Sequence, residues 1–186
     1  MPLTGSTRAL LNRFLSNEDG SVSIEAAIMT PLMIGLLAVT FVYNDAFRKK
    51  SLNTNAAFTI SDAISRETDA IDDTYLNGMH DLFDFLTHSA DRSGVRFSLL
   101  TWDNTIEDYR IDWSEVRGMF DPLDADNMNL LRNRLPNLLH NERVIVVETR
   151  SILQPILPNL GLDNQVIYNL AFSRPRFAPQ IVWNGS

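Results

Sequence analysis

The strongest constraint on this chain is an uninterrupted apolar stretch close to its N-terminus. Residues 26–43 contain no charged side chain. As a helix this stretch would be about 27 Å long, or about 33 Å if it begins at Val22, which matches a bilayer core about 30 Å thick. Pro31 would break a helix in water but is tolerated in a membrane-spanning helix. The stretch therefore predicts a transmembrane helix rather than the buried core helix of a soluble domain.

The order of features at the start of this helix differs from that of a cleavable secretory signal. A secretory signal carries its small-residue cleavage site after the apolar region, whereas the candidate small residue here, Gly20, precedes it. Cleavage after Gly20 would leave the whole helix attached. Glu25 is a lone acid at the edge of the apolar stretch. A carboxylate costs about 2.5–3.5 kcal/mol at the centre of a membrane helix, and less near its end.

This start resembles the processing site of type IV pilin-like proteins. The stretch DGSVSIEAAIMTPLMIGLL is most similar to the TadE-like pseudopilins of the Tad (tight adherence, Flp-type) pilus system, and SRPRFAPQIVW, residues 173–183, is similar to the tail of that group. The resemblance implies that a prepilin peptidase cuts after Gly20, which makes Ser21 the first residue of the mature chain. It also implies that Glu25 pairs with the N-terminal amine of a neighbouring subunit. From the residues alone, a glutamate held at the membrane interface is also possible.

The resemblance carries further expectations about the whole chain. It implies a leader over residues 1–20, a transmembrane helix over 21–45 and a soluble domain over 46–186. It places the protein in a bacterial inner membrane as a single-pass protein, with the domain in the periplasm or in an extracellular pilus. The implied partners are other pilin or pseudopilin subunits, the prepilin peptidase, the inner-membrane assembly platform and the lipid bilayer.

The distribution of positive charge conflicts with this orientation, and an alternative function also stays open. Three bases, Arg48, Lys49 and Lys50, follow the apolar stretch, whereas two, Arg8 and Arg13, precede it. The positive-inside rule therefore slightly favours a cytoplasmic domain. The alternative is an unprocessed single-pass anchor that carries a binding or sensor domain, in which Gly20 has no special role.

Composition and motifs argue against several other functions. The chain has 186 residues, a formal net charge of -7 and no cysteine. The acidic balance gives no electrostatic footprint for nucleic acid, and the lack of cysteine excludes thiol nucleophiles, thiolate metal sites and disulfides. The sequence contains no phosphate loop, no GxSxG elbow and no HExxH motif. We therefore expect no enzyme, no cofactor and no metal site.

The rest of the chain alternates helical and strand patterns. The helix is expected to continue past residue 44 with an apolar stripe from Ala56 to Ile64, from which Ser61 is excluded, and to end near residues 69–73. A second amphipathic helix is predicted over residues 75–90. Its opposite face carries His80, Asp84, His88 and Asp91, whose spacing allows a metal site but is more typical of a solvated face.

Strand patterns fill much of the remainder. We predict strands over residues 95–102, 106–113, 143–153 and 165–174, and a short helix over 128–135. Buried and exposed residues alternate in the first two strands, which are predicted to form a hairpin. The acids from Asp121 to Asp126 do not fit a calcium loop and instead predict a turn and a helix start. The predicted fold is α+β and pilin-like: a long N-terminal transmembrane helix continues into a soluble domain. That domain has an antiparallel sheet of about four strands, helices on one side and Trp183 anchored on the core.

Overall fold

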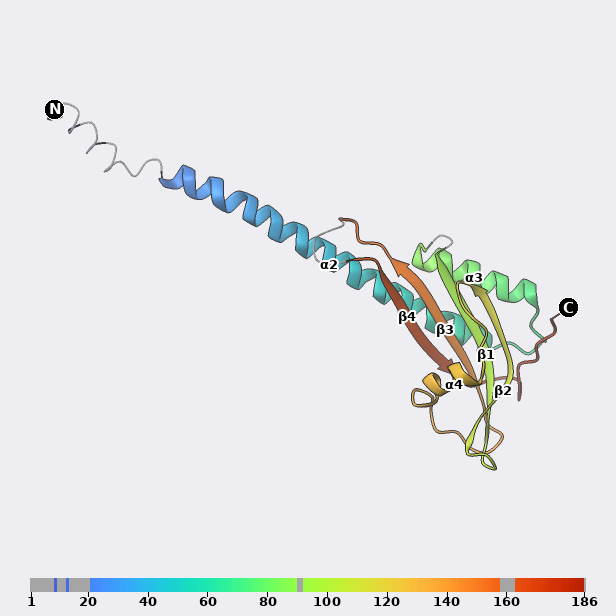
Figure 1. Ribbon diagram of the computed structural model, residues 1–186. Helices are drawn as coiled ribbons and strands as arrows, with labels where there is room; N and C mark the ends of the chain where they lie inside the picture. The colour runs from blue at the N-terminus through green and yellow to red at the C-terminus, as the bar shows by residue number, and fades with distance from the viewer. Residues whose placement is uncertain (1–8, 10–12, 14–20, 90–91, 158–162, 186) are drawn as a thin grey trace. The chain divides into compact units, whose positions relative to one another are not determined.

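The computed structural model describes residues 9, 13, 21–89, 92–157 and 163–185. It divides into two units, residues 1–44 and residues 45–186. In chain order the elements are α2 (Ser21–Ser65), α3 (Asp73–Thr87), β1 (Ser93–Asp103), β2 (Asp108–Gly118), α4 (Ala125–Arg132), β3 (Arg143–Leu153) and β4 (Gln165–Ser173) (Figure 1). The predicted α+β class is confirmed.

Helix α2 changes character along its length. In the apolar window of this helix only 6% of the residues are buried, and α2 is long and apolar enough to cross a membrane. Further along, the side chains of Ala56, Ile60 and Ile64 are almost completely buried. The predicted long N-terminal apolar helix is therefore confirmed. The helix ends at Ser65, a few residues before the acidic stretch where its end was expected.

The four strands form one sheet in the order β2-β1-β3-β4, and each neighbouring pair is antiparallel. The hairpin turn between β1 and β2 is held by the Asp103 carboxylate, which accepts a hydrogen bond from the Thr105 amide at 2.8 Å. The Thr105 amide is also the main reason that the pKa of Asp103 lies below its usual range. The predicted hairpin and antiparallel sheet are confirmed, although β2 extends five residues beyond the predicted end.

One face of the sheet, here called the inner face, is covered by the C-terminal part of α2 and by α3, as predicted. These helices and the strands share one core, which contains Ala56, Ile60, Ile64, Leu76, Phe83, Val95, Phe97, Leu99, Ile145 and Val147. Asp72 begins α3 by accepting a hydrogen bond from the Tyr75 amide at 2.8 Å. His88 ends the helix in the left-handed conformation, so α3 is slightly shorter than predicted.

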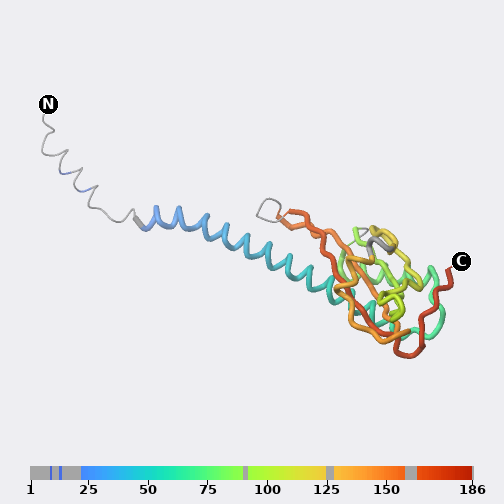
Figure 2. The backbone as a smooth tube through the Cα atoms, turned by 60° about the horizontal axis from the view of Figure 1, so that its bottom comes forward, coloured from blue at the N-terminus to red at the C-terminus, as the bar shows by residue number. Residues whose placement is uncertain are grey.

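The C-terminal segment closes this core. Trp183 stacks on Trp113 with ring centroids 6.1 Å apart, and the Trp113 indole donates to the Ile181 carbonyl at 2.8 Å. Ile71, in the connection between α2 and α3, forms a parallel bridge with Trp183. Figure 2 shows the red C-terminal segment running beside that connection. The predicted anchoring of Trp183 is confirmed.

The opposite face of the sheet, here called the outer face, is more buried than the sequence predicts. Strand β1 was expected to be half-buried, with Arg96 and Ser98 facing solvent, but these residues are only 6% and 1% exposed. The reason is a second core that α4 and the segments around it form over this face. It contains Leu100, Tyr109, Leu123, Met128, Leu131, Leu138, Val144 and Val146.

Helix α4 also lies three residues earlier than predicted. It spans Ala125–Arg132 rather than residues 128–135. The Met128 amide donates to the Asp124 carbonyl at 2.9 Å, which starts the helix directly after the acidic turn. The turn and helix start predicted for residues 121–126 are therefore confirmed, and only the register of the helix was wrong.

Candidate functional site

The first candidate site lies at the start of α2. The predicted cleavage residue, Gly20, lies outside the described residues, and the backbone of Ser21 is described as the first residue of α2. Glu25 follows on the same helix, about one turn later, and its side chain is exposed. The structure thus places the residue that would become the new N-terminus and the glutamate on one continuous helix.

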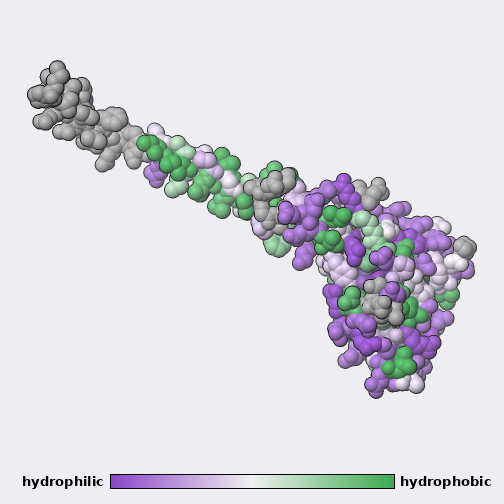
Figure 3. Space-filling model, in the orientation of Figure 1, coloured by the Kyte–Doolittle hydropathy of each residue, from purple (hydrophilic) through white to green (hydrophobic). Residues whose placement is uncertain are grey.

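The surroundings of Glu25 are apolar. Ile24 and Ile28 are 65% and 62% exposed, and Leu32 is 61% exposed. Figure 3 shows that hydrophobic residues, drawn in green, predominate along the described N-terminal part of α2. A helix that is apolar on all sides is suited to lipid rather than to water, so Glu25 is a carboxylate set into a surface that would face hydrocarbon.

A second candidate site lies on the outer face of the sheet, where β1 and β3 pair. Arg96 and Glu148 are direct cross-strand partners, and both side chains are almost fully buried. The Arg96 guanidinium donates through Nε and Nη2 to Glu148 Oε2, each at 2.6 Å. Its Nη1 donates to the Asp121 carbonyl at 3.0 Å. A guanidinium that donates through three nitrogens is rigidly held.

Tyr168 in β4 completes this cluster. Its hydroxyl donates to the other carboxylate oxygen, Oε1 of Glu148, at 2.7 Å. Burial is the largest cause that raises the pKa of Tyr168, followed by this hydrogen bond, because both favour the protonated phenol. Glu148 therefore accepts hydrogen bonds at both oxygens and has little capacity left for a ligand.

Two further arginines lie around a pocket beside this pair. The pocket has a volume of about 290 Å³ and is lined by Arg96, Phe120, Asp121, Leu130, Leu131, Arg134, Glu148, Arg150 and Tyr168. The Arg150 guanidinium lies 4.8 Å from the Phe120 ring centroid, and that of Arg134 lies 5.2 Å from the ring of Tyr168. The pocket is therefore formed by β1, β3 and β4 together with α4 and the segments on either side of it.

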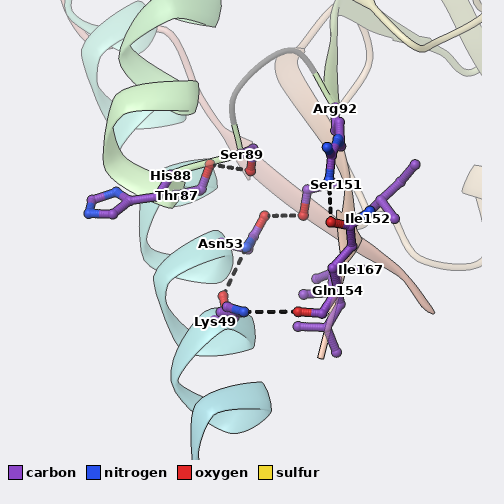
Figure 4. A pocket seen from close by; sticks show the side chains of 11 residues that line it. Lys49, Asn53, Thr87, His88, Ser89, Arg92, Ser151, Ile152, Gln154 and Ile167 are labelled. Carbon is purple, nitrogen blue, oxygen red and sulfur yellow. Dashed lines mark hydrogen bonds between the residues drawn. The ribbon is translucent and has the colours of Figure 1, made fainter. Parts of the chain in front are cut away.

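Another pocket, of about 210 Å³, lies between α2 and the ends of β3 and β4 (Figure 4). Its polar groups are engaged with one another. Lys49 donates to the Gln154 carbonyl at 3.0 Å, and Ser151 donates to Asn53 at 2.6 Å. The Arg92 guanidinium also donates to the side chain of Gln154. The bonds of Lys49 and Asn53 attach α2 to β3 and to the residue after it, so this pocket is a structural joint between the helix and the sheet.

The joint continues along α2. Thr54 donates to Asn169 of β4 at 2.9 Å, and Ser61 donates to Ser173 at the end of β4 at 2.9 Å. The Ser65 carbonyl accepts from the Arg176 amide at 2.8 Å. Ser61 was expected to lie off the buried stripe, but it is 2% exposed, because its hydroxyl is one of these buried contacts.

The polar face of α3 was predicted to be solvated, but in the structure it is only partly so. His80 and Asp84 are half-buried and both contact Ser93, with His80 Nε2 lying 2.9 Å from Ser93 Oγ. Ser93 donates to Asp84 and is 1% exposed. A nucleophilic serine would instead be accessible and would donate to the histidine, so this cluster is structural.

The other two members of the predicted polar face do not join that cluster. His88 is exposed and contacts the Phe85 carbonyl through Nδ1 at 2.9 Å, while Asp91 lies outside the described residues. Within the described part of the chain, no three His, Cys, Asp or Glu side chains are grouped so that they could hold a metal ion.

Sequence reasoning found the start of α2 but missed the arginine pocket. Arg96, Glu148 and Arg150 stand at alternate positions in strand patterns, which is where solvent-facing residues are expected. One feature of the sequence could have indicated a buried polar site here: Glu148 and Arg150 lie in the strand segment that is richest in β-branched residues. No protein-family model, curated protein or solved structure matches this chain.

Proposed function

We propose that the protein is a membrane-anchored pseudopilin or minor pilin of the TadE-like kind, which takes part in assembling a Tad-type adhesive pilus. The observation that carries this proposal is the division within α2. Its N-terminal part exposes an apolar surface over a length that fits a bilayer, and its C-terminal part is buried in the core of a four-stranded antiparallel sheet. This is the construction expected of a subunit that is anchored first and assembled later.

In this proposal Gly20 and Glu25 act together. Cleavage after Gly20 would create a new α-amino group at Ser21, and Glu25 of a neighbouring subunit would receive it. An isolated charge in lipid is unfavourable, whereas an ion pair with good geometry in a low dielectric is much less so. Glu25 would therefore favour the one register between adjacent helices in which the two charges meet.

The proposed role is structural rather than catalytic. The Ser93, His80 and Asp84 side chains, which most resemble a catalytic group, are engaged in packing α3 on the sheet. The partners in this proposal are other pilin or pseudopilin subunits, the prepilin peptidase, the inner-membrane assembly platform and the bilayer. The folded domain would lie in the periplasm or in the extracellular pilus.

The direct test is the mature N-terminus, measured by mass spectrometry of the protein purified with and without the prepilin peptidase. We expect the chain to begin at Ser21 only when the peptidase is present. Gly20→Val should block this cleavage. The matched control is Gly35→Ala, since a methyl group at Gly35 meets no neighbouring atom, and it should be processed normally. A chain that retains Met1 under both conditions would favour the unprocessed anchor of a binding or sensor domain.

A further inference from the structure

We propose that the pocket on the outer face of the sheet binds a small monocarboxylate, with Arg150 and Arg134 as the groups that receive the carboxylate. The inference concerns only the residues that line this pocket and does not rest on the proposed role in pilus assembly. It follows from three features of the pocket: the state of its arginines, its net charge and its apolar wall.

The three arginines of the pocket are not equivalent. Arg96 is fully engaged by Glu148 and by the Asp121 carbonyl. In contrast, neither Arg134 nor Arg150 has an ion pair with any carboxylate among the described residues, and each instead packs on an aromatic ring. Glu148, the nearest buried acid, is saturated by Arg96 and Tyr168. The two guanidiniums are therefore available to a ligand.

Arg150 provides an independent sign of a missing partner. Its Nε is buried and has no hydrogen-bond partner in the described structure. Buried polar atoms nearly always have a partner, and a donor on a charged group is especially costly to leave unpaired. The backbone of Arg150 is fixed in β3, where it pairs with Tyr168 across the strands, and its Nε is closed to water in this conformation. A carboxylate that draws the Arg150 guanidinium toward the pocket would supply the acceptor.

Charge selects the class of anion. The lining residues contribute three arginines against Asp121 and Glu148, which leaves a formal net charge of +1. This charge matches a single carboxylate better than a phosphate dianion. Guanidinium groups bind carboxylates through two parallel hydrogen bonds, which suits a planar ligand.

The apolar wall of the pocket indicates what kind of group the carboxylate is attached to. Leu130, Leu131 and Phe120 form its apolar part, and Leu130 is 75% exposed at the rim. A volume of about 290 Å³ accommodates a small molecule rather than a polymer chain. The ligand that fits best has one carboxylate and a compact apolar or aromatic body.

The test uses the full chain in nanodiscs of zwitterionic lipid, with phenylacetate as the probe. Phenylacetamide is the matched control ligand, because it has the same body without the charge. We expect saturable binding of phenylacetate by calorimetry, together with a shift of the Arg150 Nε–H signal in nitrogen-15 NMR spectra. Phenylacetamide should not bind measurably, and inorganic phosphate should bind more weakly than phenylacetate. Equal binding of the acid and the amide, or tighter binding of phosphate, would overturn the proposal.

Variants identify the residues. Arg150→Gln and Arg134→Gln should each weaken phenylacetate binding about tenfold or more, as expected for the loss of a hydrogen bond to a charged group. Arg174→Gln is the control, since Arg174 is exposed and pairs with Glu142 away from the pocket, and its affinity should be unchanged. Circular dichroism verifies folding. Arg134 is exposed, so its replacement should not disturb the fold. Wild-type affinity in both pocket variants would contradict the assignment.

Discussion

At the scale of single residues, Arg96 and Glu148 are opposite charges removed from water on a sheet that could have been apolar there. Removing two charges from water is expensive, and their attraction compensates only when the geometry is good and all donors and acceptors are used. Here the guanidinium donates three times and the carboxylate accepts at both oxygens. The pair therefore stabilises the fold only as a complete set.

Because the pair depends on all of these bonds, single substitutions should destabilise the fold much more than a substitution of both residues. Arg96→Met or Glu148→Leu should lower the free energy of unfolding by about 3–5 kcal/mol, because each leaves a buried charge without its partner. The double variant Arg96→Met/Glu148→Leu should recover most of this loss. Urea unfolding followed by tryptophan fluorescence measures it, since Trp102, Trp113 and Trp183 all lie in residues 45–186.

The control is an exposed ion pair. Arg66, the residue after α2, forms an exposed pair with Asp62 of α2 at 2.8 Å, and Arg66→Met should change the free energy of unfolding by less than about 1 kcal/mol. Single substitutions at Arg96 or Glu148 that behave like this control would show that the buried pair is not the structural unit described above.

In the proposed function, the charge of Glu25 is needed for filament assembly. We predict that Glu25→Gln is still processed after Gly20 but no longer supports filaments, because the uncharged amide cannot form an ion pair with a neighbouring N-terminal amine in lipid. Processing is followed by mass spectrometry and filaments are counted by electron microscopy. Glu107→Gln, a change of an exposed acid in the hairpin turn, should retain both. Normal filament numbers in Glu25→Gln would refute the pairing role.

At the scale of the elements, the end of β2 depends on one glycine. Gly118 has φ of +70°, and a Cβ there would lie 2.3 Å from the Ser93 carbonyl oxygen and 2.9 Å from His80 Nε2. The strand ends where α3 and the start of β1 meet, and it leaves no room for a side chain. Gly78, in α3, is the opposite case, since nothing lies within 4 Å of its Cβ position.

The two glycines give a matched prediction. Gly118→Ala should lower the free energy of unfolding by more than about 2 kcal/mol, through its left-handed backbone and the clash. Gly78→Ala should raise it by about 0.5–1 kcal/mol, because alanine favours the helix and meets no obstacle. Urea unfolding of the two variants side by side measures both. Similar values for the two would contradict this account of β2.

The elements themselves were largely predictable from local patterns. The β-branched run from Val144 to Val147 predicted β3 with the correct ends, and the apolar stripe of α3 predicted its buried face. The coverage of the outer face was not predictable, because Arg96 and Ser98 have the residue types of a solvated face. The pocket depends on the pairing of Arg96 with Glu148, 52 residues away in the sequence, and local spacing contains no information on such pairing.

At the scale of the whole molecule, the proposed function requires residues 45–186 to lie on one particular side of the membrane. The three bases after the apolar stretch favour the cytoplasm, whereas the proposed pilus role requires the periplasm. The chain has no cysteine, so a single introduced thiol reports its own location without interference.

We predict that Asp81→Cys, on the exposed side of α3, reacts with a membrane-impermeant maleimide in intact spheroplasts. Ala9→Cys in the uncleavable Gly20→Val background should react only after the cells are lysed, because it would lie in the cytoplasm. Labelling is read by the mass shift of the purified protein. The reverse pattern would place the domain in the cytoplasm and exclude the proposed function.

The line of hydrogen bonds between α2 and the sheet also determines how the domain would resist a pulling force. Asn53, Thr54, Ser61 and Ser65 contact β3, β4 and the segment after β4 along about 18 Å of helix. A pull along the axis of α2 would stretch these bonds in parallel, so that the load is shared instead of breaking them one at a time. Tension applied to the helix would therefore be transmitted to the sheet in shear, the direction in which such a joint resists most.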